Sequence, residues 1–254
     1  MLKSLTFTLV LVVALMNQSA ASAALDDSIV LYLAFDEGEG DEAIDGSLHG
    51  NNGELVNNPE WVDGKVGGAL EFNGAQGQHV IVPVTDALQL TETFSVAFWV
   101  KRGNAQPATW NYMVAAGTLK WAVIFNQNDG LTYVWSRSGG TWAQKDVSDD
   151  GQPQDWTHIV MTHDTGSGVT LYYDGQIAGK GAKPPVVDAI DGSIMVGARH
   201  PGQEFFTGTI DEVFLFNRII TADEMQAIME DSFLSVEPGG KLPTTWAIVK
   251  QGRR

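Results

Sequence analysis

The sequence predicts an all-β fold in which two antiparallel sheets pack face to face. Short runs rich in Val, Ile, Phe, Tyr, Trp and Thr recur between residues 28 and 216, separated by Gly, Asn and Asp. This is the pattern of strands joined by turns. Few intervening stretches have helical periodicity, which disfavours alternating strand–helix units and a parallel sheet. Cysteine is absent, so the fold would depend on a large hydrophobic core.

About eleven strands are expected from these runs. They cover residues 29–35, 69–72, 78–82, 94–100, 112–115, 121–125, 131–135, 156–163, 170–173, 193–196 and 208–216. A tight hairpin is predicted between the strands at 121–125 and 131–135, because Asp129-Gly130 between them suits positive φ angles. With these strands in register, Trp121 and Phe125 would share a face with Tyr133 and Trp135. We expect that face to point into the sandwich.

One short helix is predicted near the C-terminal end of the fold. Thr221 and Glu224 have the spacing of a capping box. Met225, Ile228 and Met229 follow at helical spacing, so one apolar face of this helix would pack on the sandwich.

The chain divides into three expected segments. Residues 1–23 have the features of a secretory signal peptide: an apolar run over residues 5–16 and an Ala21-Ser22-Ala23 cleavage pattern. A retained N-terminal anchor is the alternative, although the apolar run is short for a membrane span. Residues 24–232 would form one sandwich domain. Residues 233–254 have the composition of a linker and a basic tail, which we expect to be extended. The predicted location is therefore secreted, cell surface or periplasm.

The charge of the chain limits its partners. The formal net charge is −16 at pH 7, which argues against nucleic acid and anionic membranes because both attract cationic surfaces. An acidic surface is compatible with solubility outside the cell and with carboxylates that bind a hard cation. We therefore expect no nucleic-acid partner and no transmembrane span in the mature chain.

Seven segments taken together carry a family resemblance. They are 31–38 (LYLAFDEG), 45–53 (DGSLHGNNG), 67–74 (GGALEFNG), 94–100 (FSVAFWV), 156–164 (WTHIVMTHD), 171–175 (LYYDG) and 208–218 (GTIDEVFLFNR). In this order they resemble the laminin-G-like, concanavalin A-like jelly-roll domains of bacterial exported proteins. The resemblance covers roughly residues 27–230. It implies a two-sheet jelly roll with one short C-terminal helix.

The resemblance also implies a structural calcium ion. In this family the first and last long strands lie close together, and a cation is often held there by a carboxylate and main-chain oxygens. Asp36 and Asp211 occupy these positions, and the loop containing Asp45 and Asn52 could add oxygen ligands. Calcium takes 6–8 oxygens, so such a set would suit it. The alternative is that Asp36 and Asp211 cap turns or accept backbone N–H bonds.

A binding or adhesion role without catalysis is the expected function. By analogy with the fold, the partner would be an extracellular glycan, or alternatively a surface protein bound without sugar affinity. Five residues outside the regular strand pattern are the candidate ligand contacts: Trp110, Arg137, Trp142, Arg199 and His200. Aromatic rings would stack on sugar rings, and the polar groups would bind hydroxyls. The alternative is that these aromatic residues cover an edge of the core.

A glycoside hydrolase related to the β-glucanases is the catalytic alternative. A retaining mechanism needs two carboxylates about 5–5.5 Å apart. No expected strand has acidic residues at alternating positions, and the consecutive pair Asp211-Glu212 would face opposite ways. Neither G-x-S-x-G nor H-E-x-x-H occurs. We therefore expect no enzyme activity.

Overall fold

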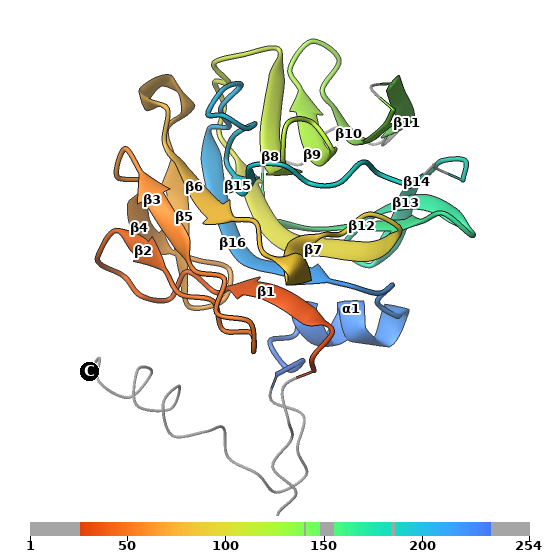
Figure 1. Cartoon of the computed structure of the whole chain (residues 1–254). Helices are drawn as coiled ribbons and strands as arrows, with labels where there is room; N and C mark the ends of the chain where they lie inside the picture. Colours follow the sequence, from red (N-terminus) through yellow and green to blue (C-terminus); the bar gives the residue numbers. More distant parts are fainter. Residues whose placement is uncertain (1–25, 140, 148–154, 184–185, 235–254) are drawn as a thin grey trace, which may run out of the picture. The chain divides into compact units, whose positions relative to one another are not determined.

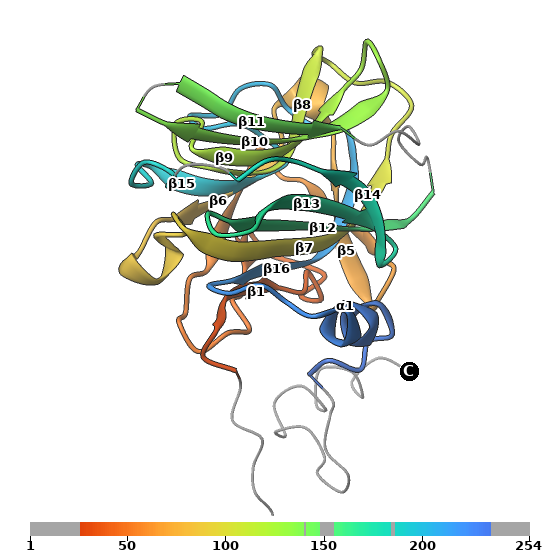
Figure 2. The same ribbon diagram turned by 90° about the vertical axis from the view of Figure 1, so that its right-hand side faces the viewer.

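The computed structural model describes residues 26–139, 141–147, 155–183 and 186–234. These residues form two antiparallel sheets in two layers and one short α-helix (Figures 1 and 2). The predicted all-β sandwich with a C-terminal helix is confirmed. The expected signal segment and, apart from residues 233 and 234, the expected tail lie outside the described residues. Within the described part of the chain, no helix is long and apolar enough to cross a membrane.

The first sheet has the strand order β14-β13-β12-β7-β16-β5-β4, and β1 pairs with β16 beside β5. Its strands are β1 (Ile29–Leu33), β4 (Glu60–Asp63), β5 (Gly68–Phe72), β7 (Thr93–Arg102), β12 (Thr157–Asp164), β13 (Gly168–Tyr173), β14 (Gln176–Lys180) and β16 (Gly208–Phe216). All nine residues of β16 are buried. A bulge interrupts its pairing with β7 between Asp211 and Phe214, where Glu212 has a left-handed φ of 52°. This bulge positions the acidic residues discussed below.

The second sheet has the order β11-β10-β9-β8-β15-β6-β3-β2. Its strands are β2 (Glu42–Ala43), β3 (Gly53–Val56), β6 (His79–Pro83), β8 (Trp110–Ala116), β9 (Trp121–Asn126), β10 (Leu131–Ser138), β11 (Thr141–Val147) and β15 (Ser193–Val196). Two 3₁₀ turns, η1 (Gly74–Gln76) and η2 (Asp86–Leu88), flank β6. The core lies between the two sheets. Trp121 of β9, for example, is fully buried, with its ring 5.3 Å from that of Phe94 on β7.

The predicted facing of the β9–β10 hairpin is wrong. Asn126 pairs with Leu131, so Tyr133 lies opposite Ile124 and Trp135 lies opposite Ala122. Cross-strand partners share a face, and a shift of one residue moves every side chain to the other face. Tyr133 and Trp135 therefore point away from the core that Trp121 enters. Their rings form part of a separate aromatic group on the outer face of the second sheet.

The helix α1 (Ala222–Met229) begins at the predicted capping box. Both capping bonds are present, from Glu224 N to Thr221 Oγ1 (3.2 Å) and from Thr221 N to Glu224 Oε2 (2.7 Å). Met225 and Ile228 are buried, and the helix lies against the first sheet beside β1 and β16 (Figures 1 and 2). The predicted helix and its apolar face are confirmed.

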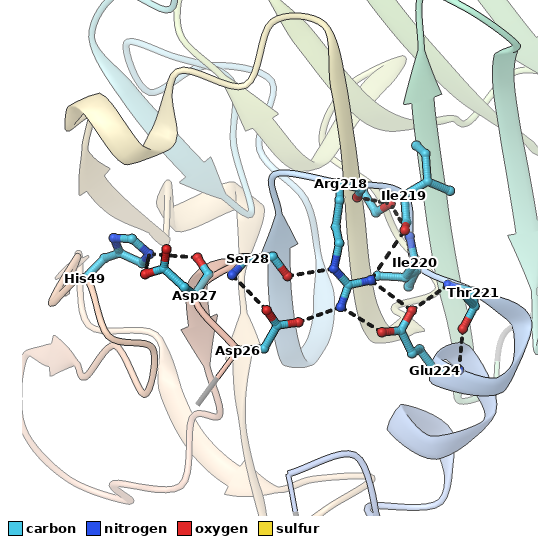
Figure 3. Close-up of polar contacts among 10 residues, drawn as sticks. Asp26, Asp27, Ser28, His49, Arg218, Ile219, Ile220, Thr221 and Glu224 are labelled. Carbon is cyan, nitrogen blue, oxygen red and sulfur yellow. Dashed lines mark hydrogen bonds and ion pairs between the residues drawn. The ribbon is translucent and has the colours of Figure 1, made fainter. Parts of the chain in front are cut away.

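A single arginine joins this helix to both ends of the domain (Figure 3). Arg218 follows β16 and donates to both carboxylate oxygens of Glu224, at 2.7 and 2.9 Å. It also donates to Asp26 Oδ2 (2.5 Å) and Ser28 Oγ (2.7 Å). Bidentate, charge-assisted contacts of this kind are among the stronger hydrogen bonds. Arg218 therefore fastens the first described residues and α1 to the end of the last strand.

Candidate functional site

Asp36 and Asp211 meet at the turn between β4 and β5. Asp211 Oδ2 accepts hydrogen bonds from Lys65 N (2.8 Å) and Val66 N (2.9 Å). Asp36 Oδ1 accepts one from Gly68 N (2.6 Å). The structure thus brings these two expected ligands to one short segment. These bonds to backbone N–H groups are also what the turn-capping alternative predicts.

Glycines allow this close approach. A β-carbon at Gly64 would lie 2.7 Å from Asp211 Oδ2, and one at Gly67 would collide with Asp36 Oδ1. Gly67 also has a φ of 67°, a backbone conformation that residues other than glycine rarely adopt. The sequence predicts a turn at the glycines 64, 67 and 68. It does not predict that this turn packs against Asp36 and Asp211, which are distant from it in sequence.

The acidic group is strongly buried. Asp211 is fully buried, and its Oδ1 has no hydrogen-bond partner among the described residues. Burial, with the nearby charge of Asp36, raises the pKa of Asp211 to about 7 despite the bonds from Val66 and Lys65. Burial and then the charge of Asp211 raise the pKa of Glu212 to about 9, while the Tyr32 hydroxyl donates to Glu212 at 3.0 Å. A cation beside Asp36 and Asp211 would favour the ionised form of the buried Asp211 carboxyl group.

The side chains at this turn therefore supply only some of the ligands that a calcium ion needs. An unpaired buried carboxylate oxygen is a suitable ligand for a hard cation. Among the described residues, however, no three or more His, Cys, Asp or Glu side chains are grouped as a metal cluster. Main-chain carbonyls and water would have to complete the coordination.

Asp45 and Asn52 belong to a different group of contacts. The Asp45 carboxylate accepts from Tyr32 N (2.9 Å), Ser47 N (2.9 Å), Ser47 Oγ (2.7 Å) and Asn51 N (2.7 Å). Asn52 Oδ1 accepts from Asp45 N at 2.9 Å. These bonds fasten the loop at 45–52 to β1. The structure does not join the two residues to the turn at which Asp36 and Asp211 meet, and Asp45 has the contacts of a loop-fixing carboxylate.

A second candidate region is the aromatic cluster, which we define as Trp110, Tyr133 and Trp135. The ring of Trp110 lies 4.7 Å from that of Trp135 and 5.3 Å from that of Tyr133. Trp110 belongs to β8 and the other two to β10, and the intervening β9 presents Ala122 and Ile124 on this face. These smaller side chains let the large rings meet across the middle strand. Trp110 and Trp135 are both half-buried, so part of each ring reaches solvent.

Three other expected ligand contacts are Arg137, Trp142 and Arg199. The expected position outside the strands is wrong for Trp110, Arg137 and Trp142, which lie in β8, β10 and β11, because the hairpin continues past residue 135. Arg137 pairs with Trp142 across β10 and β11, but the side chain of Trp142 lies outside the described residues. Arg199 is engaged within its own loop, with Nε 2.6 Å from Glu204 Oε2 and a bond from Nη2 to Gln203 Oε1. Glu204 O accepts from Tyr112 N at 3.1 Å, which ties this loop to the strand of Trp110.

His200 contacts a different part of the chain, the turn at Gly192. Its ring packs on Gly192, where a β-carbon would lie 2.7 Å from the imidazole. Sequence reasoning found Trp110 but missed Tyr133 and Trp135, because it assigned them to the core. The alternation of aromatic residues along 131–135 was the available signal. The correct hairpin register was needed to interpret it.

Comparisons with known protein families and solved structures identify the same two-sheet fold. The profile of the concanavalin A-like lectin/glucanases superfamily matches residues 73–226. Domain 4 of the GH43 extracellular arabinanase from Geobacillus stearothermophilus, solved with arabinotriose, has a TM-score of 0.64 and 22% identity; the match covers 80% of this chain and 98% of that domain. No curated protein sequence matches the chain.

Two further solved structures belong to other functional classes. The binding domain of botulinum neurotoxin DC, in complex with rat synaptotagmin II, has a TM-score of 0.63 and 12% identity; 82% of this chain and 52% of that chain are covered. Trypanosoma rangeli sialidase, in complex with the inhibitor DANA, has a TM-score of 0.61 and 17% identity, with 81% and 33% covered. This chain thus spans about half of the neurotoxin domain. At these identities the likeness establishes the fold alone.

Proposed function

The chain belongs to the concanavalin A-like lectin/glucanases superfamily, and from this premise we propose that it is a non-catalytic, exported module that binds carbohydrate. The aromatic cluster is the observation that carries the proposal. Two half-buried tryptophans, Trp110 on β8 and Trp135 on β10, bring their rings together on the face of the second sheet that points away from the core between the sheets. Binding sites for small molecules are commonly lined by aromatic side chains with a few polar groups. The arabinotriose bound by a similar domain supports this ligand class.

Calcium has a structural role in this proposal. Asp36 and Asp211 would hold the ion, and its charge would offset the buried carboxyl groups at the β4–β5 turn. The partnerless Asp211 Oδ1 supports this assignment. The same two residues fix the turn by accepting hydrogen bonds from Lys65, Val66 and Gly68.

Export is supported by the N-terminal sequence and by the charge of the chain. The apolar run at 5–16 precedes a small-residue cleavage pattern. The absence of cysteine removes any need for disulfide formation after export. The similar arabinanase domain belongs to an extracellular enzyme, which is consistent with this location.

A glycan array probed with the native protein and the Trp110→Ala and Trp135→Ala variants tests the proposal. We expect binding to a defined set of glycans that both substitutions weaken. Trp156→Ala is a matched control, because Trp156 is also half-buried but lies outside the aromatic cluster. Binding that survives in both cluster variants would contradict the proposed surface.

Protein binding is the second candidate function. The complex of a similar domain with synaptotagmin favours it. In this case the array would remain silent, while a surface-protein partner would bind the native chain and lose affinity in the Trp110→Ala variant. The two functions therefore separate on whether a purified glycan alone is bound.

A further inference from the structure

A hollow of about 450 Å³ lies at one end of the β4–β5 hairpin. Glu60 begins β4, and Phe72 ends β5, whereas the turn that Asp36 and Asp211 contact closes the other end of the hairpin. The hollow is thus separate from the proposed calcium position. Its walls are β4, β5, η1 and the loop that follows β7. Its lining includes Glu60, Glu71, Gln76, Gln106, Pro107 and Thr207.

Buried amides hold the walls in place. The Gln106 side chain donates to Gly103 O (3.1 Å) and Thr207 O (2.7 Å) and accepts from Thr207 N (3.0 Å). Gln78, also buried, accepts from Asn73 N (2.7 Å) and donates to Asn58 O (2.8 Å). These bonds order the loops before any ligand arrives, which lowers the entropic cost of binding.

The open surface of the hollow is rich in acceptors. Glu60 and Glu71 are direct cross-strand partners, so their side chains share one face, and both are exposed. In the described ranges, no Lys, Arg or His forms an ion pair with either residue. Like charges directly opposite one another destabilise a sheet. Gln76, whose Oε1 accepts from Gln78 Nε2 (3.2 Å), and the exposed Pro107 also line the hollow.

We propose that this hollow is a second saccharide-binding site, selective for neutral sugars, in addition to the aromatic cluster. The proposal rests on the proposed carbohydrate-binding function. Sugar hydroxyls would donate to Glu60 and Glu71, and Gln76 can both donate and accept. A uronate, sulfate or phosphate group would be repelled, because no cationic side chain of the described residues lines the hollow and the chain carries a net charge of −16. The volume lies within the range of small-molecule sites.

The pair Glu60 and Glu71 resembles the two carboxyl groups of a glycoside hydrolase in its spacing. Directly opposed residues bring β-carbons to about 4.5–5.5 Å, and a retaining glycosidase places its carboxyl groups about 5–5.5 Å apart. In such enzymes, however, the two carboxyl groups occupy different environments, one of them enclosed. Glu60 and Glu71 are both exposed, which favours binding over catalysis.

Calorimetric titration of the protein tests the proposal. The probes are arabinotriose and neutral xylo-, manno- and gluco-oligosaccharides, with trigalacturonate as the anionic counterpart. We expect two saccharides per native chain for at least one neutral probe and no binding of trigalacturonate in the hollow. The variants are Trp110→Ala, the double variant Glu60→Ala/Glu71→Ala and the double variant Glu60→Gln/Glu71→Gln. Glu54→Ala is the matched control, because Glu54 is an exposed strand residue on β3, away from the hollow.

The double alanine variant should weaken one of the two sites about tenfold or more, since it removes charge-assisted hydrogen bonds. The double glutamine variant should retain most of the affinity, because amide oxygens still accept from hydroxyls. Trp110→Ala should remove the other site, and Glu54→Ala neither. A single site that Trp110→Ala abolishes and Glu60→Ala/Glu71→Ala leaves unchanged would overturn this inference while preserving the proposed function.

Three other results would also overturn it. Absence of any saccharide binding would refute both the hollow and the proposed function. Cleavage of a probe that is lost in Glu60→Gln/Glu71→Gln would make the hollow a hydrolytic site. Calcium binding that depends on Glu60 and Glu71, with unchanged saccharide titrations, would make it a cation site.

Discussion

The buried carboxylate of Asp211 predicts a calcium-dependent change in the stability of the protein. Its Oδ1 lacks a partner among the described residues, and a bound cation would stabilise the folded state by mass action. At a free calcium concentration of about 100 times Kd, this amounts to about 3 kcal/mol. The melting temperature should then rise by about 5–10 °C.

Calcium and EDTA titrations followed by thermal melting check this prediction for the native protein, Asp36→Ala, Asp211→Ala and Asp45→Asn. The first two substitutions should abolish the calcium-dependent increase. Asp45→Asn should lower the melting temperature with and without calcium, because it weakens a loop anchor, and should retain the increase. Identical melting of the native protein in calcium and in EDTA would remove the metal from the account.

His158 provides a second prediction. The imidazole is fully buried, with its ring 5.1 Å from that of Trp99, and neither ring nitrogen has a hydrogen-bond partner among the described residues. Burial lowers the pKa of His158 to about 3. The unfolded chain binds this proton near pH 6.5, so stability should fall as the pH decreases from about 6.5 towards 3.

Replacing His158 by Leu should make the unfolding free energy less dependent on pH across this window. Chemical denaturation at a series of pH values measures the effect. His49→Gln is the control, because His49 lies in a partly exposed loop. An unchanged pH dependence in His158→Leu would show that the ring is not buried in its neutral form.

At the element scale, the helix α1 depends on Arg218. The guanidinium donates to Glu224, and this bond lowers the pKa of Glu224 although burial opposes the shift. A carboxyl group with a lowered folded pKa contributes stability above its unfolded pKa and loses it as the pH falls through the folded value. The contribution of the Arg218–Glu224 pair should therefore be present at neutral pH and decline as the pH falls below the ordinary glutamate pKa of 4.5.

Glu224→Gln should cost about 1 kcal/mol at pH 7 and much less at pH 3, because the pair is partly exposed and the amide can keep the capping bond. Denaturation at the two pH values gives the comparison. Glu230→Gln, an exposed position at the end of the same helix, serves as the control. A loss of equal size at both pH values would mean that packing rather than charge is responsible.

Elements with a local pattern can be predicted from the sequence, and those that depend on register cannot. The capping box at Thr221 and Glu224 involves contacts within four residues, so the sequence predicts the helix with its correct start. The predicted β9–β10 facing is wrong because the loop takes up residues 127–130, which shifts the pairing by one residue. That single shift moves Tyr133 and Trp135 to the outer face of the second sheet, where Tyr133 is buried beside the half-buried Trp110 and Trp135 of the proposed site.

The contacts of the candidate site also depend on residues that are distant in sequence, so most of them could not be predicted. The proximity of Asp36 and Asp211 is implied by the family resemblance, and both contact one turn in the structure. The engagement of Arg199 with Glu204 depends on the exact course of its loop, which the sequence pattern does not reveal. The hollow near Glu60 and Glu71 arises from strands and loops distant in sequence, and no motif marks it.

At the scale of the whole molecule, the two sheets explain stability without disulfides. Side chains from both sheets form one continuous core, and burial of apolar surface contributes about 25 cal/mol per Å². On the outer face of the second sheet a smaller apolar cluster is covered by Trp110 and Trp135, which remain partly exposed. The proposed function requires Trp110 and Trp135 to contact a saccharide there.

Side-chain indole N–H signals of the eight tryptophans in a two-dimensional ¹H–¹⁵N spectrum test this claim most directly. Single Trp→Phe variants assign the signals. Titration with arabinotriose, or with the best ligand from the glycan array, should shift the signals of Trp110 and Trp135 and leave the core residue Trp121 unchanged. Saturable binding that leaves both cluster signals unmoved would contradict the account.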